Sequence, residues 1–130
     1  MILLDTHVVV WLTTDKRQLS TLAATKIREA SRAGQGLAIA SSTLWEIAMM
    51  SIQHQFRLPG TLAEYLRYVE SVFVVLPITG AIAERSIQFM GEFPKDPTDR
   101  LIAATALVHT IPLVTKDKRI RSSNQVDCVW

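Results

Sequence analysis

Short apolar runs alternate with longer amphipathic segments along the whole chain. The apolar runs are continuous, with no strict alternation of apolar and polar residues, which is typical of strands that are buried on both faces. They predict five strands, over residues 2–5 (ILLD), 37–41 (LAIAS), 72–76 (VFVVL), 112–115 (PLVT) and 126–129 (VDCV).

Helical periodicity fills the intervals between these runs. Three of the predicted helices carry start signals: Ser20 as an N-cap with Gly34 after the end, a capping box at residues 61–64 (TLAE), and Asp96 followed by Pro97. The predicted helices cover residues 7–12, 20–33, 42–53, 61–71, 79–90, 96–109 and 118–121.

The alternation of strands and helices predicts an α/β fold, with a parallel sheet of about five strands sandwiched between helices. The chain has 130 residues, which suits a single domain over residues 1–130. In parallel sheets of this kind, ligands bind in the crevice at the carboxyl ends of the strands. Functional side chains are therefore expected where strands end.

Composition narrows the class of protein. Hydrophobic residues make up 48% of the chain and the mean hydropathy is +0.20, which favours a subunit with an apolar partner surface. The single cysteine, Cys128, excludes an intramolecular disulfide and a Cys-rich zinc site. No apolar run approaches the ~18 residues of a membrane span, and Asp5 interrupts the apolar start, so no signal peptide is expected. We expect a cytoplasmic protein without a membrane partner.

Four of the 12 acidic residues occupy positions that a solvated surface does not explain. Asp5 ends the first predicted strand, and Asp117 directly follows the fourth. Glu46 lies among apolar residues one turn into the helix after the second strand. Asp99 lies in the first turn of the helix that Asp96 opens. The crevice rule predicts that these carboxylates gather at one edge of the sheet.

Such a cluster needs neutralisation. Two like charges ~4 Å apart cost about 4 kcal/mol at an effective dielectric constant of ~20, so protons or cations must accompany them. Oxygen ligands alone suit hard divalent cations such as Mg²⁺ or Mn²⁺. Carboxylate-held divalent ions are a recurrent device for in-line phosphodiester hydrolysis.

Each acid also has a simpler alternative role at a helix end or a turn. The alternatives are a cap for Asp5 and for Asp96, a capping box of Thr43 with Glu46, a favourable helix-dipole position for Asp99, and a turn for Asp117. Four such acids on one edge of one sheet are less expected by chance than any one of them.

Basic residues surround two of the acids. Arg100 follows Asp99, and the candidate contacts for an RNA backbone around Asp117 are Lys116, Lys118 and Arg119. A site that cuts a polyanion needs lysine and arginine beside its acidic pocket, because these side chains bind the phosphates on either side of the cut. A solvated basic loop is the alternative.

Four segments are similar to the motifs of one family. The segments MILLDTHVVVW, SSTLWEIAMM, DPTDRLIAATAL and LVTKD, in this order, resemble PIN-domain ribonucleases of the VapC type, the toxins of type II toxin–antitoxin pairs. The resemblance implies a Mg²⁺-dependent endoribonuclease that forms a homodimer and is neutralised by a cognate antitoxin. Its catalytic metal ligands would be Asp5, Glu46, Asp99 and Asp117. Thr115 would orient Asp117 through its hydroxyl, and Asp96 would remain the helix cap with a possible supporting role.

Two other functions remain open at this stage. One is a PIN-like module that binds nucleic acid or protein without cutting. The other is a phosphohydrolase with an aspartyl-phosphate, which His7 disfavours because that chemistry usually places a second aspartate there. His7 is expected to be structural, and His54 and His109 to lie at the surface. Core or subunit-interface roles, with base stacking as the lesser alternative, are expected for Trp11, Trp45, Met49 and Met50.

Overall fold

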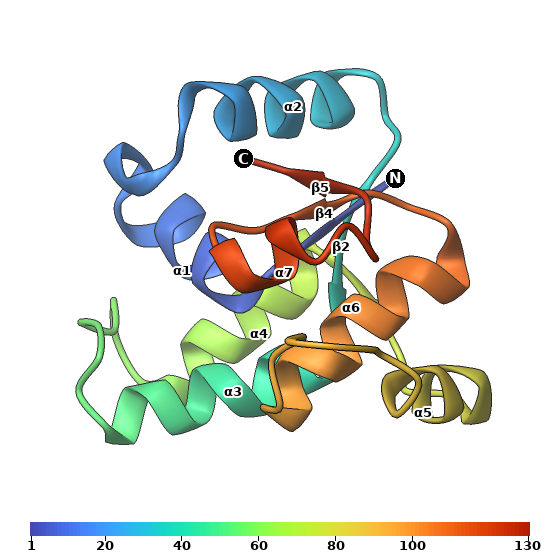
Figure 1. Ribbon diagram of the computed structural model, residues 1–130. Coiled ribbons are helices and arrows are strands. Elements are labelled where there is room, and N and C mark those ends of the chain that lie inside the picture. Colours follow the sequence, from blue (N-terminus) through green and yellow to red (C-terminus); the bar gives the residue numbers. More distant parts are fainter.

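The computed structural model describes residues 1–130, and its elements follow the predicted order (Figure 1). The strands are β1 (Ile2–Leu4), β2 (Leu37–Ala40), β3 (Val74–Leu76), β4 (Leu113–Val114) and β5 (Cys128–Val129). The helices are α1 (Thr6–Thr14), α2 (Thr21–Arg32), α3 (Ser41–Ile52), α4 (Leu62–Val72), α5 (Gly80–Ser86), α6 (Pro97–His109) and α7 (Lys118–Ser122). A 3₁₀ turn, Lys16–Gln18, is an element that the sequence pattern did not predict.

The five strands form one parallel sheet in the order β3-β2-β1-β4-β5. The first strand of the chain therefore lies at the centre, where Leu3 is in register with Ala38 on one side and Leu113 on the other. This confirms the predicted α/β fold with its five-stranded parallel sheet. Helices on both faces leave the strand ends as the open edge.

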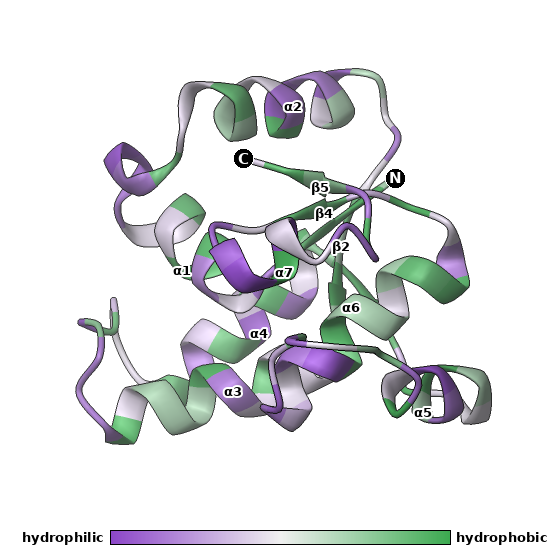
Figure 2. Cartoon of the chain, in the orientation of Figure 1, coloured by the Kyte–Doolittle hydropathy of each residue, from purple (hydrophilic) through white to green (hydrophobic).

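Successive residues of β1 point into two separate cores. Ile2 and Leu4 pack in the core that is shared with α1, α2 and α4, whereas Leu3 packs in the core shared with α5, α6 and α7. Helix α3 contacts α1, α4 and α6 and so bridges the two layers. Figure 2 shows the result, with apolar strands at the centre and the polar segments on helices and loops.

The cap signals were accurate, but several boundaries were wrong. The hydroxyls of Ser20 and Thr61 accept from the first turns of α2 and α4, and Asp96 caps α6. Helix α4 extends to Val72, so β3 starts later than predicted. Helix α5 ends at Ser86 instead of residue 90. The segment after α5 is irregular because two phenylalanines, Phe89 and Phe93, stack 3.9 Å apart and bury themselves beside α6.

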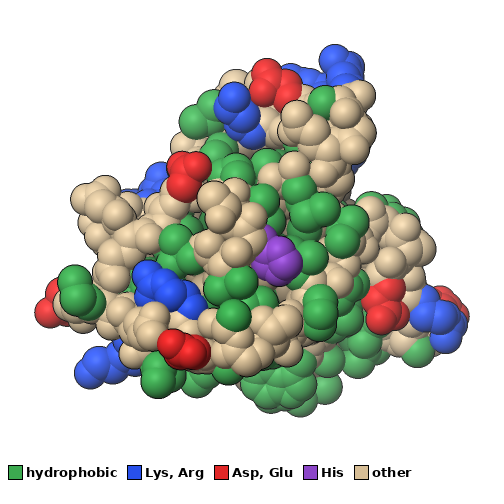
Figure 3. Space-filling view, turned by 90° about the vertical axis from the view of Figure 1, so that its right-hand side faces the viewer, with side chains coloured by type: hydrophobic (Ala, Val, Ile, Leu, Met, Phe, Trp, Pro, Cys, Tyr) green, Lys and Arg blue, Asp and Glu red, His purple; other side chains and the backbone are tan.

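The surface carries several large apolar side chains. Trp45 is 60% exposed and lies outside the core, so its alternative role at a subunit interface stays a prediction, whereas Met50 is buried in the first core. Figure 3 shows apolar side chains spread through the middle and lower part of one face, with many of the charged groups towards its margins. None of the helices combines the length and the apolar character that crossing a membrane requires.

Candidate active site

A pocket of about 380 Å³ opens at the carboxyl ends of β1 and β4. It brings together all four acids that the sequence singled out, from four separate parts of the chain. Five acidic side chains line it: Asp5, Glu46, Asp96, Asp99 and Asp117. The rest of the lining consists of His7, Trp11, Lys116 and Arg119.

Asp5 is held at the junction of β1 and α1. Its Oδ1 accepts a hydrogen bond from the Thr6 backbone N–H at 2.8 Å, which makes it the N-cap of α1. Its Oδ2 accepts from the Thr115 hydroxyl at 2.6 Å. The side chain is only 8% exposed, and burial raises the pKa of Asp5 although both hydrogen bonds act to lower it. Asp5 is thus both a helix cap and a wall of the pocket.

Thr115 forms hydrogen bonds with two of the pocket acids. Its hydroxyl donates to Asp5 and accepts from the backbone N–H of Asp117 at 3.1 Å. The expected hydrogen bond between the Thr115 hydroxyl and Asp117 is therefore present, but it holds the backbone of Asp117, and the carboxylate that the hydroxyl contacts is that of Asp5. Because β1 and β4 are neighbours in the sheet, the hydroxyl at the end of β4 faces the acid at the end of β1.

Glu46 is gripped by two threonines. Its Oε1 accepts from the Thr6 hydroxyl and its Oε2 accepts from the Thr98 hydroxyl at 2.9 Å. Thr98 also lies 2.8 Å from Oδ1 of Asp96, but a hydroxyl has one proton, so it can serve only one of the two carboxylates at a time. The capping box of Thr43 with Glu46 is absent because α3 starts at Ser41 and places Glu46 beyond the first turn.

Asp99 has no donor. No side chain or backbone N–H of the protein hydrogen-bonds to its carboxylate, although it lies in the first turn of α6. Burial, together with the negative charges of Asp5 and the other pocket acids, raises the pKa of Asp99 to about 7. A substantial fraction of the Asp99 side chains is therefore protonated near neutral pH when nothing else neutralises the pocket.

Asp117 is partly neutralised by its own helix. It caps α7, and its Oδ1 accepts from the backbone N–H groups of Arg119 at 2.8 Å and Ile120 at 3.3 Å. Its Oδ2 lies 3.6 Å from the guanidinium of Arg119, a side chain that is 66% exposed. Asp117 is therefore a helix cap in place of the turn aspartate of the alternative, and it also lines the pocket.

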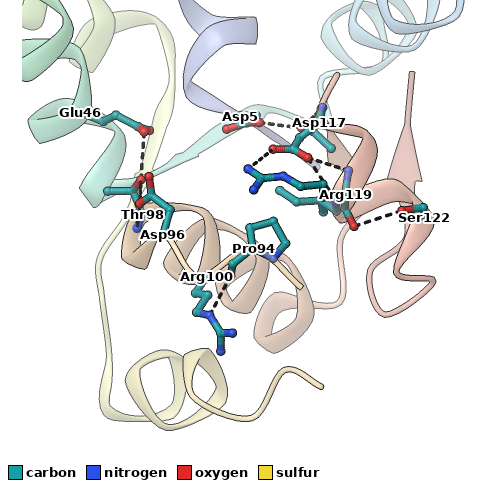
Figure 4. A network of polar contacts seen from close by, with 11 residues as sticks. Asp5, Glu46, Pro94, Asp96, Thr98, Arg100, Asp117, Arg119 and Ser122 are labelled. Carbon is teal, nitrogen blue, oxygen red and sulfur yellow. Dashed lines mark hydrogen bonds and ion pairs between the residues drawn. The ribbon is translucent and has the colours of Figure 1, made fainter. Parts of the chain in front are cut away.

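The basic residues divide into two groups. Lys116 and Arg119 line the pocket, whereas Lys118 is exposed outside it. Arg100 turns away from the carboxylates, as Figure 4 shows, and its Nε donates to the Pro94 carbonyl at 2.8 Å. Its guanidinium also lies over the ring of Phe93 at 5.8 Å. Arg100 thus fixes the segment before α6 and lies outside the pocket lining, and its predicted contact with an RNA backbone stays a prediction.

Comparison with known proteins decides the family. The family model described as PIN domain matches residues 2–124, nearly the whole chain. This chain belongs to the PIN-domain family. The match covers the first four of the five strands and every acid of the pocket.

Named relatives agree with this PIN assignment. The chain is 35% identical over 121 residues to Ribonuclease VapC22 of Mycobacterium tuberculosis, covering 93% of this chain and 90% of the relative. A chain of a toxin–antitoxin complex from Klebsiella pneumoniae is 25% identical, with a TM-score of 0.60 and coverage of 90% and 87%. A chain of VapBC2 from Rickettsia felis, bound to a promoter DNA fragment, has a TM-score of 0.66 and coverage of 98% and 97%. At 16% identity, this last match supports the PIN fold alone.

The donor set of this PIN domain suits a hard divalent cation in composition, but the side chains are not gathered around one point. No three histidine, cysteine, aspartate or glutamate side chains form a group that could hold a metal ion as they stand. The hydrogen bonds explain this arrangement, since threonines hold Asp5 and Glu46 and helix α7 holds Asp117. Asp99 is the carboxylate that is free to turn towards a cation.

The sequence predicted Thr115 as a threonine that positions an acid, but not the two threonines that hold Glu46. Thr6 and Thr98 contact Glu46 from segments 40 and 52 residues away. Each stands directly beside a recognised feature, Thr6 after Asp5 and Thr98 after Pro97. That adjacency was the available signal, because hydroxyls at the start of a helix point towards the same edge as the cap.

Proposed function

We propose that this PIN domain is an endoribonuclease, the toxin of a type II toxin–antitoxin pair, and that Mg²⁺ or Mn²⁺ is its cofactor. The observation that carries the proposal is the convergence of Asp5, Glu46, Asp99 and Asp117 in one pocket with Lys116 and Arg119 at its side. Like charges in one pocket are neutralised by protons or by a cation, and a divalent cation would neutralise several of them at once. A bound divalent ion would supply an activated water and stabilise charge on a phosphate.

The protein's own residues would divide the work by how firmly each is held. Thr115 and Thr6 fix Asp5, and Thr98 fixes Glu46. These two carboxylates would therefore be oriented before the ion binds. The Asp99 carboxylate has no hydrogen-bond donor that it would lose on binding an ion, so it would complete the ligand set. Asp117 would exchange its ion pair with Arg119 for the ion.

Two exposed basic side chains would then bind the substrate. Lys116 and Arg119 lie at the pocket but form no buried hydrogen bond there, so both can turn towards phosphates on either side of the cut. This placement keeps the RNA backbone over the carboxylates that would otherwise repel it.

The relatives support the substrate and the partner. RNA as substrate is supported by the relative named as a ribonuclease, with 35% identity. A cognate antitoxin is supported by the matching chain from a toxin–antitoxin complex. A homodimer in the cytoplasm is our expectation from the apolar surface and the family, and the exposed Trp45 is compatible with a subunit interface.

The test is an endonuclease assay on a pool of structured RNA. Wild type and Asp99→Asn are compared with Mg²⁺, with Mn²⁺ and with EDTA. The matched control is Asp127→Asn, which changes an exposed aspartate outside the pocket. We expect cleavage by wild type and the control with metal, at least a hundredfold loss in Asp99→Asn, and none in EDTA.

Other outcomes would assign another function. Cleavage that persists in EDTA would contradict the metal, and cleavage that persists in Asp99→Asn would contradict the site. RNA binding without any turnover by folded wild type would favour the non-cutting binding module. That alternative draws on the absence of a preformed three-acid metal group.

A further inference from the structure

Two aromatic side chains of α1 form one wall of the carboxylate pocket. His7 and Trp11 are four residues apart, so they lie on the same face of the helix. Their ring centroids are 5.7 Å apart at an interplanar angle of 50°. Both line the pocket that also holds Asp5. An aromatic surface therefore continues directly from the proposed metal ligands.

Packing within the protein accounts for the presence of Trp11 better than for that of His7. Trp11 is partly buried and its ring lies 5.9 Å from that of Trp130, so it is braced against the C-terminal end of the sheet. His7 is exposed, and its imidazole makes no hydrogen bond or ion pair with the protein. A structural role thus accounts for Trp11 in part and leaves His7 without a function.

A cation already marks the open face of the indole. The Nζ of Lys116 lies 5.4 Å from the centroid of the Trp11 ring. An ammonium group over an aromatic face is a modest attraction of about 0.5–1 kcal/mol at an exposed site. A group that binds the ring more strongly can displace the ammonium, which then remains at the pocket that Lys116 already lines.

The chemistry of this wall suits one part of an RNA chain. A phosphate is repelled by the negative face of an aromatic ring, and a hard divalent ion prefers oxygen ligands to that face. A sugar ring offers little flat surface for stacking. Unpaired bases do stack on histidine and tryptophan, and proteins that read RNA commonly hold bases splayed out of a loop or single strand in this way.

We propose that His7 and Trp11 form a subsite for one unpaired nucleobase next to the scissile phosphate, and that Lys116 leaves the indole for that phosphate when the base stacks. The inference rests on the proposed nuclease function and deepens it. It makes single-stranded or looped RNA the substrate class, since a base within a duplex cannot reach the wall.

The first experiment measures binding without cleavage. Asp99→Asn with Mg²⁺ serves as the parent, and the probes are a labelled single-stranded RNA pool of random sequence, an abasic ribose-phosphate oligomer of the same length, and a paired duplex. We expect the parent to bind the base-containing pool roughly 5- to 100-fold more tightly than the abasic oligomer or the duplex, as stacking of one base provides.

Variants then assign that preference to the wall. Trp11→Leu and His7→Gln, each added to the parent, should reduce the preference for bases, whereas His7→Phe keeps a ring and should retain it. Tyr68→Leu changes an exposed aromatic residue on α4, far along the chain from the pocket, and is the matched control. His7 is exposed, so its variants keep the experiment decisive if Trp11→Leu fails to fold.

Kinetics in the wild-type background separate binding from chemistry. The subsite predicts a KM raised about 5- to 100-fold in His7→Gln with little change in kcat, and rescue by His7→Phe. A lower kcat at unchanged KM would make His7 part of the chemistry and overturn the subsite. Equal affinity of the parent for base-containing and abasic probes would overturn it too, whether or not the wild type cuts RNA. Failure of wild type to cleave, with the base preference intact, would overturn the nuclease proposal alone.

Discussion

Among the pocket acids, Asp99 is the one whose charge the protein does least to offset. Its carboxylate has no donor, and its pKa is raised to about 7 from an ordinary value of 3.8. A raised pKa means that the folded state holds this proton at pH values where the unfolded chain has released it. The contribution of Asp99 to stability therefore falls as the pH rises from about 4 to about 7.

Asp99→Asn should remove this pH dependence. In EDTA, we expect the variant to gain stability relative to wild type as the pH is raised from 4 to 8, with most of the difference appearing by pH 7. Thermal melts of both proteins at a series of pH values measure it. A difference in melting temperature that stays constant over this range would contradict the assigned environment of Asp99.

Asp5 gives a second residue-scale prediction. Burial disfavours its charged form, so Asp5→Asn should leave the metal-free fold as stable as wild type or more stable, by up to about 2 kcal/mol. The asparagine carbonyl can still cap α1, and its amide can donate to the Thr115 hydroxyl. Cleavage should be abolished. Urea unfolding in EDTA and the endonuclease assay check the two halves, and a collapsed fold or surviving cleavage would refute them.

At the level of elements, two arginines near the pocket have opposite roles. Arg100 ties α6 to the irregular segment before it through the Pro94 carbonyl, while Arg119 is exposed on α7. Arg100→Met should cost about 1–3 kcal/mol of unfolding free energy, as loss of a charged hydrogen bond does, with KM for RNA unchanged.

Arg119→Met is the matched counterpart. It should leave stability within about 0.5 kcal/mol of wild type and raise KM, with a smaller dependence of KM on salt because one phosphate contact is lost. Urea titrations and kinetics at two salt concentrations test the pair. The assignment fails if the variants exchange these effects.

Sequence patterns recovered the elements because continuous apolar runs and cap signals are local. The same patterns did not predict the end of an element where the packing of distant side chains sets that end. The end of α5 at Ser86 is such a case, since Ile87 and Met90 keep a helical spacing while a stacked phenylalanine pair, Phe89 and Phe93, packs beside α6. The direction of Arg100 was not predicted for a related reason, because neighbours on a helix point about 100° apart and Asp99 faces the pocket while Arg100 does not.

The acids of the candidate site were predictable, and the residues that support them were predictable only in part, through Thr115 and Asp96. Asp5 and Asp117 follow strands, so the crevice rule places them. The grip of Thr98 on Glu46 depends on how α3 packs against α6, a contact between segments 52 residues apart. Nor does any local signal show that the Thr115 hydroxyl faces β1.

For the whole molecule, a divalent cation should act as a stabilising ligand. A cation that binds the folded pocket and not the unfolded chain raises stability by about 2.7 kcal/mol at a hundred times its dissociation constant. We expect Mg²⁺ or Mn²⁺ to raise the melting temperature of wild type at pH 8, and to have little effect on Asp99→Asn. Sodium chloride at matched ionic strength is the control. Equal shifts in both proteins would mean that the ion binds elsewhere.

The central place of β1 in the sheet has a consequence for how the protein is made. During synthesis, β1 must wait for β4, because the hydrogen bond from Thr115 to Asp5 joins residues 110 positions apart. A nascent chain that stops before Asp117 also lacks one of the acids that line the pocket. The proposed carboxylate site therefore cannot form on a partly synthesised chain until residues 115–117 have emerged beside β1.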